Sequence, residues 1–325
     1  MSLIPYDATM SYGRTFWVGL TNTLLVSALG IVAATILGFI IGVARLSSNW
    51  LVAKVSLVYI EVIRNIPLLL QIFFWYFAVL GALPSPRQSI DVGGTVFLNN
   101  RGLYVPEPLT QDGFGLVWLA LLVAIAAVIG IRLWAKKRQL ATGEIFPTFK
   151  VGLAILVVLP ALAYFAAGSP LQWEMPELRG FNFGGGITII PELAALWLAL
   201  SLYTASFIAE IVRSGIQSVS HGQTEAAFAL GVKPNWTMRL IIIPQALRVI
   251  IPPLISQYLN LTKNSSLAIA VGYMDARGTL GGITINQTGR ELEGMLLLGG
   301  FYLLVSLGIS GAMNIYNSAV KLKER

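Results

Sequence analysis

The chain has 325 residues, of which 56% are hydrophobic and only 11% charged, whereas an ordinary soluble domain carries about 25% charged residues. It contains no cysteine and a single histidine, which excludes disulfides and thiolate metal sites and leaves few ways to build acid–base or metal chemistry. The formal net charge of +7 would suit a nucleic-acid binder only if the basic residues formed one patch, and they are instead scattered between apolar segments.

Several apolar segments are long enough to cross a bilayer, which takes roughly 20 residues of helix. Seven candidates lie at residues 16–44, 55–81, 114–134, 151–168, 193–213, 246–270 and 294–318. The second contains Pro67 and should bend or split there, because an internal proline removes a backbone hydrogen bond. The fourth is short and contains Pro160, and its loss would reverse the orientation of every later segment. These segments predict an all-α polytopic membrane protein with about seven transmembrane helices.

Basic residues are distributed unevenly between the two sides of this arrangement. With the N-terminus outside, most lysines and arginines of the connecting segments fall inside, and the densest cluster is RLWAKKRQ at 132–139. The positive-inside rule favours that orientation. We therefore expect the N-terminus outside, the C-terminus in the cytoplasm and no nucleic-acid partner.

The cytoplasmic loop between the fifth and sixth segments, residues 214–245, contains the stretch EAAFALGVKPNWTMRLIIIP. Its first part favours a short helix, because alanine and leucine are strong helix formers. Gly231 is placed to end that helix, and Pro234 suits the first turn of a second one. Pro244 should separate the second helix from the sixth span. The pattern predicts two short helices joined by a glycine turn on the cytoplasmic surface.

Small side chains in this loop suggest a docking surface. Ala226 and Ala227 should leave one helix face low enough for another protein to approach closely, and Glu225 stands at the start of the helix, where the macrodipole favours an anion. An alternative is that the two helices merely lie on the membrane surface. The physical pattern alone leaves both interpretations open.

The loop also resembles a known signature. The order Glu-Ala-Ala, three residues, Gly, nine residues, Ile-x-x-Pro resembles the loop of permease subunits of bacterial ABC importers, although Ile243 stands where the family usually has leucine. The flanking stretches at 59–77, 201–223 and 244–268 resemble the polar amino acid branch, and most closely the long permease of general L-amino acid importers. The likeness covers nearly the whole chain.

The resemblance implies a type I permease core of five helices with an inserted helical pair. We divide the chain into N-terminal core helices at 1–82, an inserted region with two extra membrane helices and periplasmic segments at 83–190, and a C-terminal core at 191–325 that contains the loop 214–245. The location implied is the bacterial inner membrane, with the N-terminus periplasmic. The implied role is the translocation path of an ATP-driven amino acid importer.

The implied partners are an ATPase subunit, a second permease, a periplasmic amino acid-binding protein and an L-amino acid substrate. A heterodimer with a different permease is preferred to a homodimer. The residues agree that ATP must be bound elsewhere, because the chain has no G-x-x-x-x-G-K-[ST] phosphate loop. No cofactor, metal site or catalytic residue is expected in this chain, which is not predicted to be an enzyme.

We expect the loop to receive the movement of the ATPase. The expected coupling residues are Ser220, His221, Gly222, Gln223, Glu225, Ala226, Ala227, Gly231, Ile241 and Pro244. His221 is interpreted as a surface contact rather than as a pH sensor or a base, because no second histidine or nucleophile accompanies it.

Charged residues inside the predicted spans are costly and usually functional. Glu61 and Arg64, like Glu210 and Arg213, are spaced i,i+3 and so lie on one face of a helix. The simple interpretation is a local ion pair or an arginine that reaches the interface. The alternative is pairing between helices that holds an inner gate.

Lys263 lies on the order of 20 Å into the bilayer, about 15 residues past Arg248 at 1.5 Å per residue. It is accompanied by Asn264, Ser265 and Ser266, and Pro252 and Pro253 could break the helix before it. Polar groups at that depth are tolerated only against protein or a water-filled cavity. Glu61, Arg64, Lys263, Asn264, Ser265 and Ser266 are therefore the candidates for the path or its gate. The alternative is a buried lysine paired with Glu61.

Two other functions were weighed. A stand-alone ion-coupled secondary amino acid transporter would use Glu61, Arg64 and Lys263 as an ion relay. An intramembrane enzyme is the weaker alternative, because the chain has one histidine and no cysteine. The first alternative predicts that the purified chain accumulates substrate on an ion gradient without any other subunit.

Overall fold

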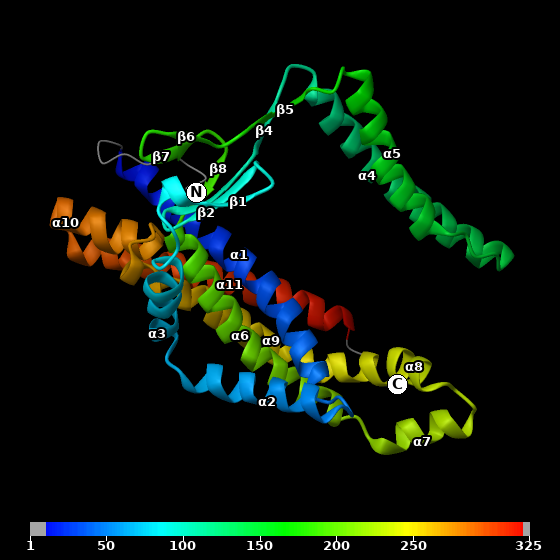
Figure 1. The fold of residues 1–325 in the computed structure, drawn as a ribbon. Helices are drawn as coiled ribbons and strands as arrows, with labels where there is room; N and C mark the ends of the chain where they lie inside the picture. The colour runs from blue at the N-terminus through cyan, green and yellow to red at the C-terminus, as the bar shows by residue number, and fades with distance from the viewer. Residues whose placement is uncertain (1–10, 321–325) are drawn as a thin grey trace. The chain divides into compact units, whose positions relative to one another are not determined.

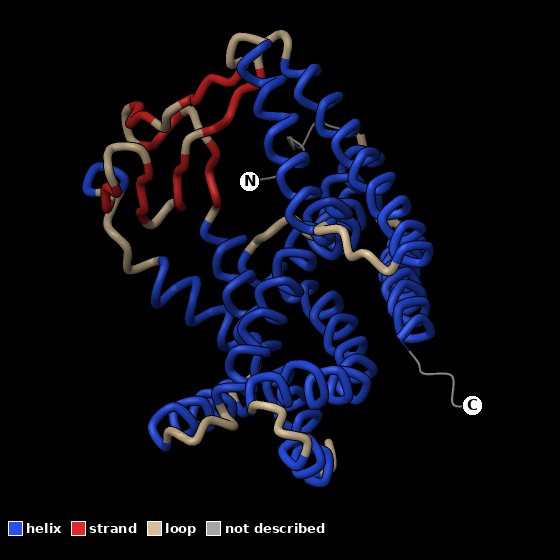
Figure 2. The backbone as a smooth tube through the Cα atoms, turned by 90° about the vertical axis from the view of Figure 1, so that its right-hand side faces the viewer, coloured by secondary structure: helices blue, strands red, loops and turns tan. Residues whose placement is uncertain are grey.

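A computed structural model describes residues 11–320, with side chains to Ile315. The two termini lie outside these residues, and so do Lys321, Lys323 and Arg325, whose charge contributed to the predicted orientation. The chain forms two compact units. Unit 1 comprises Met1–Ser85, Asn99–Leu103 and Ile189–Arg325, and unit 2 comprises Pro86–Leu98 and Tyr104–Thr188. Helices make up most of the described chain, as Figure 2 shows in blue.

Unit 1 is a bundle built around one central helix. Its elements in order are α1 (Tyr12–Ala44), α2 (Trp50–Asn65), α3 (Leu68–Phe73), the π-helix η1 (Phe74–Leu80), α6 (Pro191–Gln217), α7 (His221–Ala229), α8 (Pro234–Thr237), the π-helix η3 (Met238–Ile242), α9 (Ile243–Asn264), the 3-10 helix η4 (Ser265–Val271), the π-helix η5 (Arg277–Thr284), α10 (Ile285–Thr288) and α11 (Glu291–Val320). Helices α1, α2, α3 and α9 all pack against α6, which runs through the middle of the bundle in Figure 1.

Glycines bring α1 and α6 into close contact. A Cβ atom added at Gly38 would lie 2.6 Å from the Cβ of Ile208, and one at Gly42 would lie 2.6 Å from the carbonyl oxygen of Ala209. Small residues at such a crossing let two membrane helices approach until their backbones touch. The buried core of unit 1 therefore centres on the α1–α6 contact, with Ile208 and Val212 fully buried.

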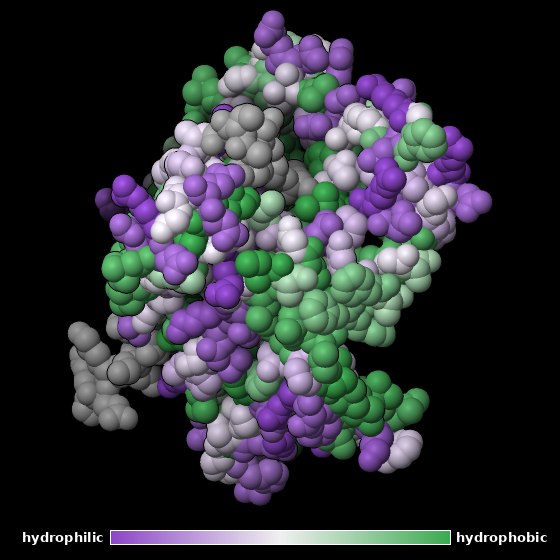
Figure 3. Space-filling view, turned by 90° about the vertical axis from the view of Figure 1, so that its left-hand side faces the viewer, coloured by the Kyte–Doolittle hydropathy of each residue, from purple (hydrophilic) through white to green (hydrophobic). Residues whose placement is uncertain are grey.

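The helices agree with the predicted spans. In the described part of the chain, six are long and apolar enough to cross a membrane: Tyr12–Ala44, Phe114–Thr142, Thr148–Ala166, Pro191–Gln217, Pro234–Val271 and Glu291–Ile315. The count becomes seven if the bent pair Trp50–Asn65 and Leu68–Leu80 is one span. On the face drawn in Figure 3, hydrophobic residues (green) form a broad exposed area, as expected of helices that contact lipid.

The second predicted span is bent by 105° near Pro67. Ile66, which precedes the proline, is extended with φ −94° and ψ 127°, the conformation that a following proline favours. The buried side-chain amide of Gln71 donates hydrogen bonds of 2.9 Å to the carbonyls of Ile63 and Ile66. These bonds satisfy backbone acceptors that the break would otherwise leave without a partner.

The sixth span differs from its prediction. The sequence predicts that Pro244 separates it from a short surface helix and allows a break at Pro252 and Pro253. Instead α8, η3 and α9 follow one another without a gap, and Pro234–Val271 is a single candidate span. Pro244 is tolerated because it directly follows the π-helical turn of η3, where the regular i→i−4 hydrogen-bond ladder is already interrupted.

Unit 2 contains a helical pair and short strands. Helices α4 (Phe114–Thr142) and α5 (Thr148–Ala166) form a hairpin, and Pro160 lies inside α5 without ending it. The basic stretch 132–139 is part of α4 rather than of a loop. This pair lies in the inserted region, where two extra membrane helices were expected.

Strands in the inserted region were not predicted from the sequence. They are β1 (Ile90–Val92), β2 (Val96–Asn99), β3 (Gly102–Val105), β4 (Glu107–Thr110), β5 (Leu171–Glu174), β6 (Glu177–Arg179), β7 (Asn182–Gly184) and β8 (Ile187–Ile189), and the 3-10 turn η2 (Pro86–Gln88) precedes them. The antiparallel pairs β1–β2, β4–β5 and β6–β7 lie within unit 2. Phe183 stacks against Phe97 and Tyr104, with centroids 4.6 and 4.9 Å away.

Candidate coupling loop and polar face

Helix α7 ends in a turn that requires glycine. Gly231 has φ +75°, the left-handed conformation in which a side chain is strained. The Val232 N–H donates to the Ala227 carbonyl oxygen at 3.0 Å and the Gly231 N–H donates to that of Phe228 at 2.9 Å. These bonds satisfy carbonyls at the end of the helix. The predicted helix, glycine turn and second helix are therefore present, although the second helix continues into a membrane span.

The surface of α7 is polar and exposed. His221 Nδ1 lies 3.0 Å from Glu225 Oε1, one helical turn away, and the two side chains are 84% and 71% exposed. Both side chains lie on the surface of α7, and the interpretation of His221 as a contact of the coupling loop stays a prediction. The prediction that Ala226 and Ala227 together form a docking face is wrong. Ala226 is exposed, whereas the exposed fraction of Ala227 is only 3%. Adjacent residues of a helix point in different directions, so only Ala226 lies on the outward face.

The other loop residues are divided between three elements. Ser220 is the N-cap residue of α7, and Gly222 and Gln223 lie in its first turns. Gln245 Nε2 donates to Gln223 Oε1 at 3.2 Å, which links α7 to the start of α9. Ile241 belongs to η3 and Pro244 to α9. The candidate coupling residues thus lie partly on the exposed α7 and partly at the N-terminal end of a long candidate membrane span.

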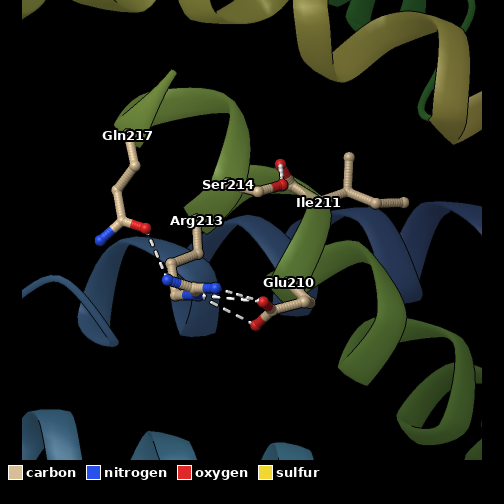
Figure 4. A network of polar contacts seen from close by, with 5 residues as sticks. All are labelled: Glu210, Ile211, Arg213, Ser214 and Gln217. Carbon is tan, nitrogen blue, oxygen red and sulfur yellow. Dashed lines mark hydrogen bonds and ion pairs between the residues drawn. The ribbon is translucent and has the colours of Figure 1, made fainter. Parts of the chain in front are cut away.

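Glu210 and Arg213 form the local ion pair that their spacing predicts. Arg213 Nε donates to both carboxylate oxygens, at 3.1 and 3.0 Å, and its NH2 contacts Oε1. Gln217 accepts a further bond from the same guanidinium, as Figure 4 shows. These contacts are all made within α6, and among the described residues no ion pair joins Glu210 to another helix.

Glu61 and Arg64 do not form the same pair. Among the described residues, no ion pair joins them, and the Arg64 guanidinium instead lies 5.3 Å from the ring centre of Phe207. Glu61 is exposed on α2, just before the 105° bend. Because the bend redirects the chain, the two residues lie on a helix separate from the rest of the predicted span.

Lys263 is exposed at the end of α9. No ion pair joins it to Glu61 among the described residues, so the predicted alternative of a buried Lys263–Glu61 pair is wrong. The side chain borders an open hollow of about 360 Å³, together with Ser266, Arg277 and Tyr302. Asn264 is half-buried and Ser265 is buried. A polar side chain cannot face lipid at low cost, so this face needs water or protein against it.

Polar residues that we did not single out lock the segment before η5. Asp275 is fully buried and accepts hydrogen bonds from the Gly278 N–H at 2.8 Å and the Tyr302 hydroxyl at 3.2 Å. Burial raises the pKa of this carboxyl above its usual value, and these hydrogen bonds oppose that rise. A lone aspartate in a polar loop carries no local sign that it is buried.

Helix α1 supplies the partners of the same segment. Asn22 Nδ2 donates to the Met274 carbonyl oxygen at 2.8 Å, and the Ala276 N–H donates to Thr23 Oγ1 at 2.9 Å. These contacts join residues about 250 positions apart, so only the folded chain reveals them. No group of three His, Asp or Glu side chains in the described part of the chain could hold a metal ion.

The fold and these sites define a polytopic helical membrane protein. An exposed helical loop directly precedes its longest candidate span. The chain belongs to the family described as binding-protein-dependent transport system inner membrane component, whose profile matches residues 141–322. The predicted family and the predicted role of a permease subunit are thereby confirmed. A stand-alone secondary transporter is not supported.

Similar proteins agree with this membership. The chain is 54% identical over 323 residues to the putative amino-acid ABC transporter permease protein YhdX of Escherichia coli (strain K12), covering 99% of this chain and 82% of that protein. It is 52% identical over 324 residues to the general L-amino acid transport system permease protein AapQ of Rhizobium johnstonii, covering 100% of this chain and 81% of that protein.

A solved structure shows the same fold. It is described as the crystal structure of an amino acid ABC transporter with histidines, and it matches with a TM-score of 0.55 at 21% identity over 95% of each chain. At that identity the likeness supports the arrangement of helices and nothing finer. The predicted permease fold is confirmed.

Proposed function

We propose that this chain is the membrane permease of an ABC importer for L-amino acids, that it couples to a separate ATPase through the loop 225–244, and that it works with a second permease and a periplasmic binding protein. The substrate class is supported by the amino acid transport named for the relatives. The chain itself has no phosphate-binding loop, so ATP is bound by the partner. The loop faces the cytoplasm and the N-terminus the periplasm.

The single observation that carries the coupling role is the construction of the loop. Helix α7 is exposed, the turn at Gly231 is closed by hydrogen bonds from Gly231 and Val232 back to α7, and the chain then runs without a gap from α8 through η3 into α9. A push on α7 is therefore transmitted through one short turn to a helix that crosses the membrane. The π-helical turn η3 is a point where such a helix can change direction, because π-turns interrupt the regular hydrogen-bond ladder.

The translocation path is proposed along the exposed polar face of α9 and η4. Ser256, Asn260 and Lys263 are exposed on one stripe of this helix, at the three- and four-residue spacing of one face. A second permease on this side would remove the polar stripe from lipid and enclose the path between two subunits. We also propose the division 1–82, 83–190 and 191–325, which the limits of the two compact units support in outline.

The coupling role is tested in the complete importer, in proteoliposomes with its co-purifying subunits. Glu225→Ala removes the exposed carboxylate that pairs with His221, and uptake of a radiolabelled L-amino acid should fall at least about tenfold, the factor that corresponds to 1.4 kcal/mol of lost docking energy. The amount of chain in the membrane should be unchanged. ATP hydrolysis is measured in parallel to separate uncoupling from loss of the ATPase.

The matched control is Glu293→Ala, because Glu293 is likewise an exposed helical glutamate, in α11. It should leave uptake within about twofold of wild type, as surface substitutions usually change energies by less than 0.5 kcal/mol. Full uptake by Glu225→Ala would argue against coupling through this loop. Accumulation of substrate by the isolated chain without ATP would argue against the whole proposal.

A further inference from the structure

An apolar cavity lies where the ends of α1, α6 and the α8–α9 helix meet. It has a volume of about 420 Å³, and its walls include Phe39, Val43, Val212, Ile243 and Ile250. Ser47 is the one polar residue among the described residues that line it. The site described for coupling does not use this cavity, although Met238 of η3 forms part of its wall.

The cavity is continuous with the outer surface of α1. A neighbouring open hollow of about 480 Å³ is lined by Phe39, Ile40, Val43 and Ala44, three of which also line the cavity. Ile40 is 61% exposed, and α1 is a candidate membrane span. The hollow therefore opens sideways onto a helix surface that contacts hydrocarbon.

Ser47 alone does not hold water in such a space, because a buried water makes about three hydrogen bonds to polar partners. Leaving it empty forfeits dispersion contacts with every wall atom and costs stability in proportion to its volume. An apolar cavity of about 150 Å³ already accommodates a benzene molecule, so this one has room for a flexible hydrocarbon chain. Lipid is the apolar molecule that surrounds the opening.

The charges beside the cavity favour an anionic headgroup. Arg45 is the C-cap residue of α1 and lies between the lining residues Ala44 and Leu46. Arg213 is held by Glu210 on α6, so the headgroup is assigned to Arg45. Basic pockets between membrane helices on the cytoplasmic side bind phosphate-containing headgroups.

We propose that this cavity binds one acyl chain of an anionic phospholipid, whose phosphate is held by Arg45 beside the mouth. The acyl chain then lies between the end of α1 and the wall formed by Met238, Ile243 and Ile250, the part of the chain that connects the exposed loop to the membrane span. The lipid fills the space into which this helix would otherwise collapse and so sets its position relative to α1.

The proposal is tested on the full importer in nanodiscs that contain phosphatidylglycerol with a photoactivatable diazirine in its acyl chain. After illumination, mass spectrometry should locate cross-links in the peptides around 39–52 and 238–250. Ala44→Phe, which places a ring in the cavity, should reduce these cross-links about tenfold, a change equal to ~1.4 kcal/mol. Leu247→Trp fills the same cavity from α9 and should have the same effect. It keeps the test valid if Ala44→Phe fails to fold.

The control is Ala28→Phe, the same substitution at an exposed position of α1 outside the cavity, and it should leave the cross-links unchanged. Undiminished cross-links in both filling variants would overturn the proposal. Cross-links that occur in the isolated chain but disappear in the complete importer would overturn it as well, because a partner subunit would then fill the cavity.

The headgroup is tested by exchanging the lipid. Diazirine-bearing phosphatidylcholine should cross-link less than phosphatidylglycerol in the wild type, and Arg45→Gln should abolish that difference while the filling variants abolish both signals. Equal cross-linking by the two lipids in the wild type would contradict the role of Arg45 and the anionic preference.

Discussion

At residue 231 the backbone adopts φ +75° in open space, since a Cβ atom added there would meet nothing within 4 Å. Glycine is required here for its conformation alone and not for close packing. The nearby Gly222 is different, because it lies within α7 with an ordinary helical backbone. The two glycines therefore separate the effect of backbone strain from that of an added methyl group.

We predict that Gly231→Ala strains the turn by about 1 kcal/mol, the cost of the left-handed conformation for a residue with a Cβ. Uptake per ATP hydrolysed should fall several-fold, because the angle between α7 and the next helix changes. Gly222→Ala should leave the stability unchanged or slightly raised, since alanine favours helix. The melting temperature in detergent measures the strain, and proteoliposomes measure coupled uptake and hydrolysis. Equal melting temperatures of the two variants would show that the turn is not strained.

A second residue-scale prediction concerns the buried carboxyl of Asp275, whose pKa is raised in the folded chain. Between the unfolded pKa of about 4 and that raised value, the folded state binds more protons than the unfolded state. The free energy of unfolding should therefore be highest below pH 4 and decrease as the pH rises through this window.

Asp275→Asn removes this pH dependence while its side-chain oxygen can still accept the Gly278 N–H. Thermal unfolding of the purified protein in detergent, measured from pH 4 to pH 7, should show wild type losing stability relative to the variant. Parallel melting curves across that range would mean that the carboxyl has the same pKa in the folded and the unfolded chain, and would contradict the raised pKa.

At the scale of elements, unit 1 depends on close contacts made by α1. Gly19 faces the start of η5, and a Cβ atom there would lie 2.9 Å from the Cα of Ala276 and clash with Thr279. The same face of α1 contributes Asn22 and Thr23 to the segment around Asp275. One helix thus holds both the central α6 and the segment that follows the sixth span.

We predict that Gly19→Ala destabilises the protein by about 1–3 kcal/mol, the usual cost of overpacking, and lowers the melting temperature in detergent. Gly13→Ala is the matched control, because Gly13 lies in the same helix and a Cβ atom there would meet nothing within 4 Å. It should be neutral or stabilising. A melting temperature that is equal for the two variants would contradict the packing described here.

At the scale of the whole molecule, orientation decides which surface each partner can reach. Basic residues predict that the loop with α7 is cytoplasmic, and unit 2 then has its strands in the periplasm. The bend at Pro67 makes the span count six or seven, and only the count of seven agrees with this orientation. The chain contains no native cysteine, so introduced thiols can report it without background.

We predict that a membrane-impermeant maleimide labels Leu178→Cys, in β6, in cells whose outer membrane has been made permeable. Leu230→Cys, next to Gly231 and 83% exposed, should be labelled only after the inner membrane is opened. The cysteine-free parent is the control. Labelling of Leu230→Cys in intact inner membranes would place the loop outside and remove the basis for ATPase coupling.

The sequence by itself determined the features that arise locally. The number and approximate limits of the apolar helices, the glycine turn at 231 and the Glu210–Arg213 pair each depend on residues within one or two helical turns. The family was identified from the same local pattern at 225–244. Each of these features has a local physical cause. The helices follow from the length of an apolar stretch, the turn from the backbone conformation of glycine, and the ion pair from i,i+3 spacing.

Only the tertiary structure decided which residues are buried and which distant residues contact one another. Gln71 supports the 105° bend, α1 and α11 enclose Asp275, and the direction of α9 leaves Lys263 exposed rather than paired with Glu61. The strands of the inserted region form through pairing that short apolar stretches do not reveal. Burial and partner choice are set by contacts between residues up to about 250 positions apart, and these contacts exist only once the helices have packed.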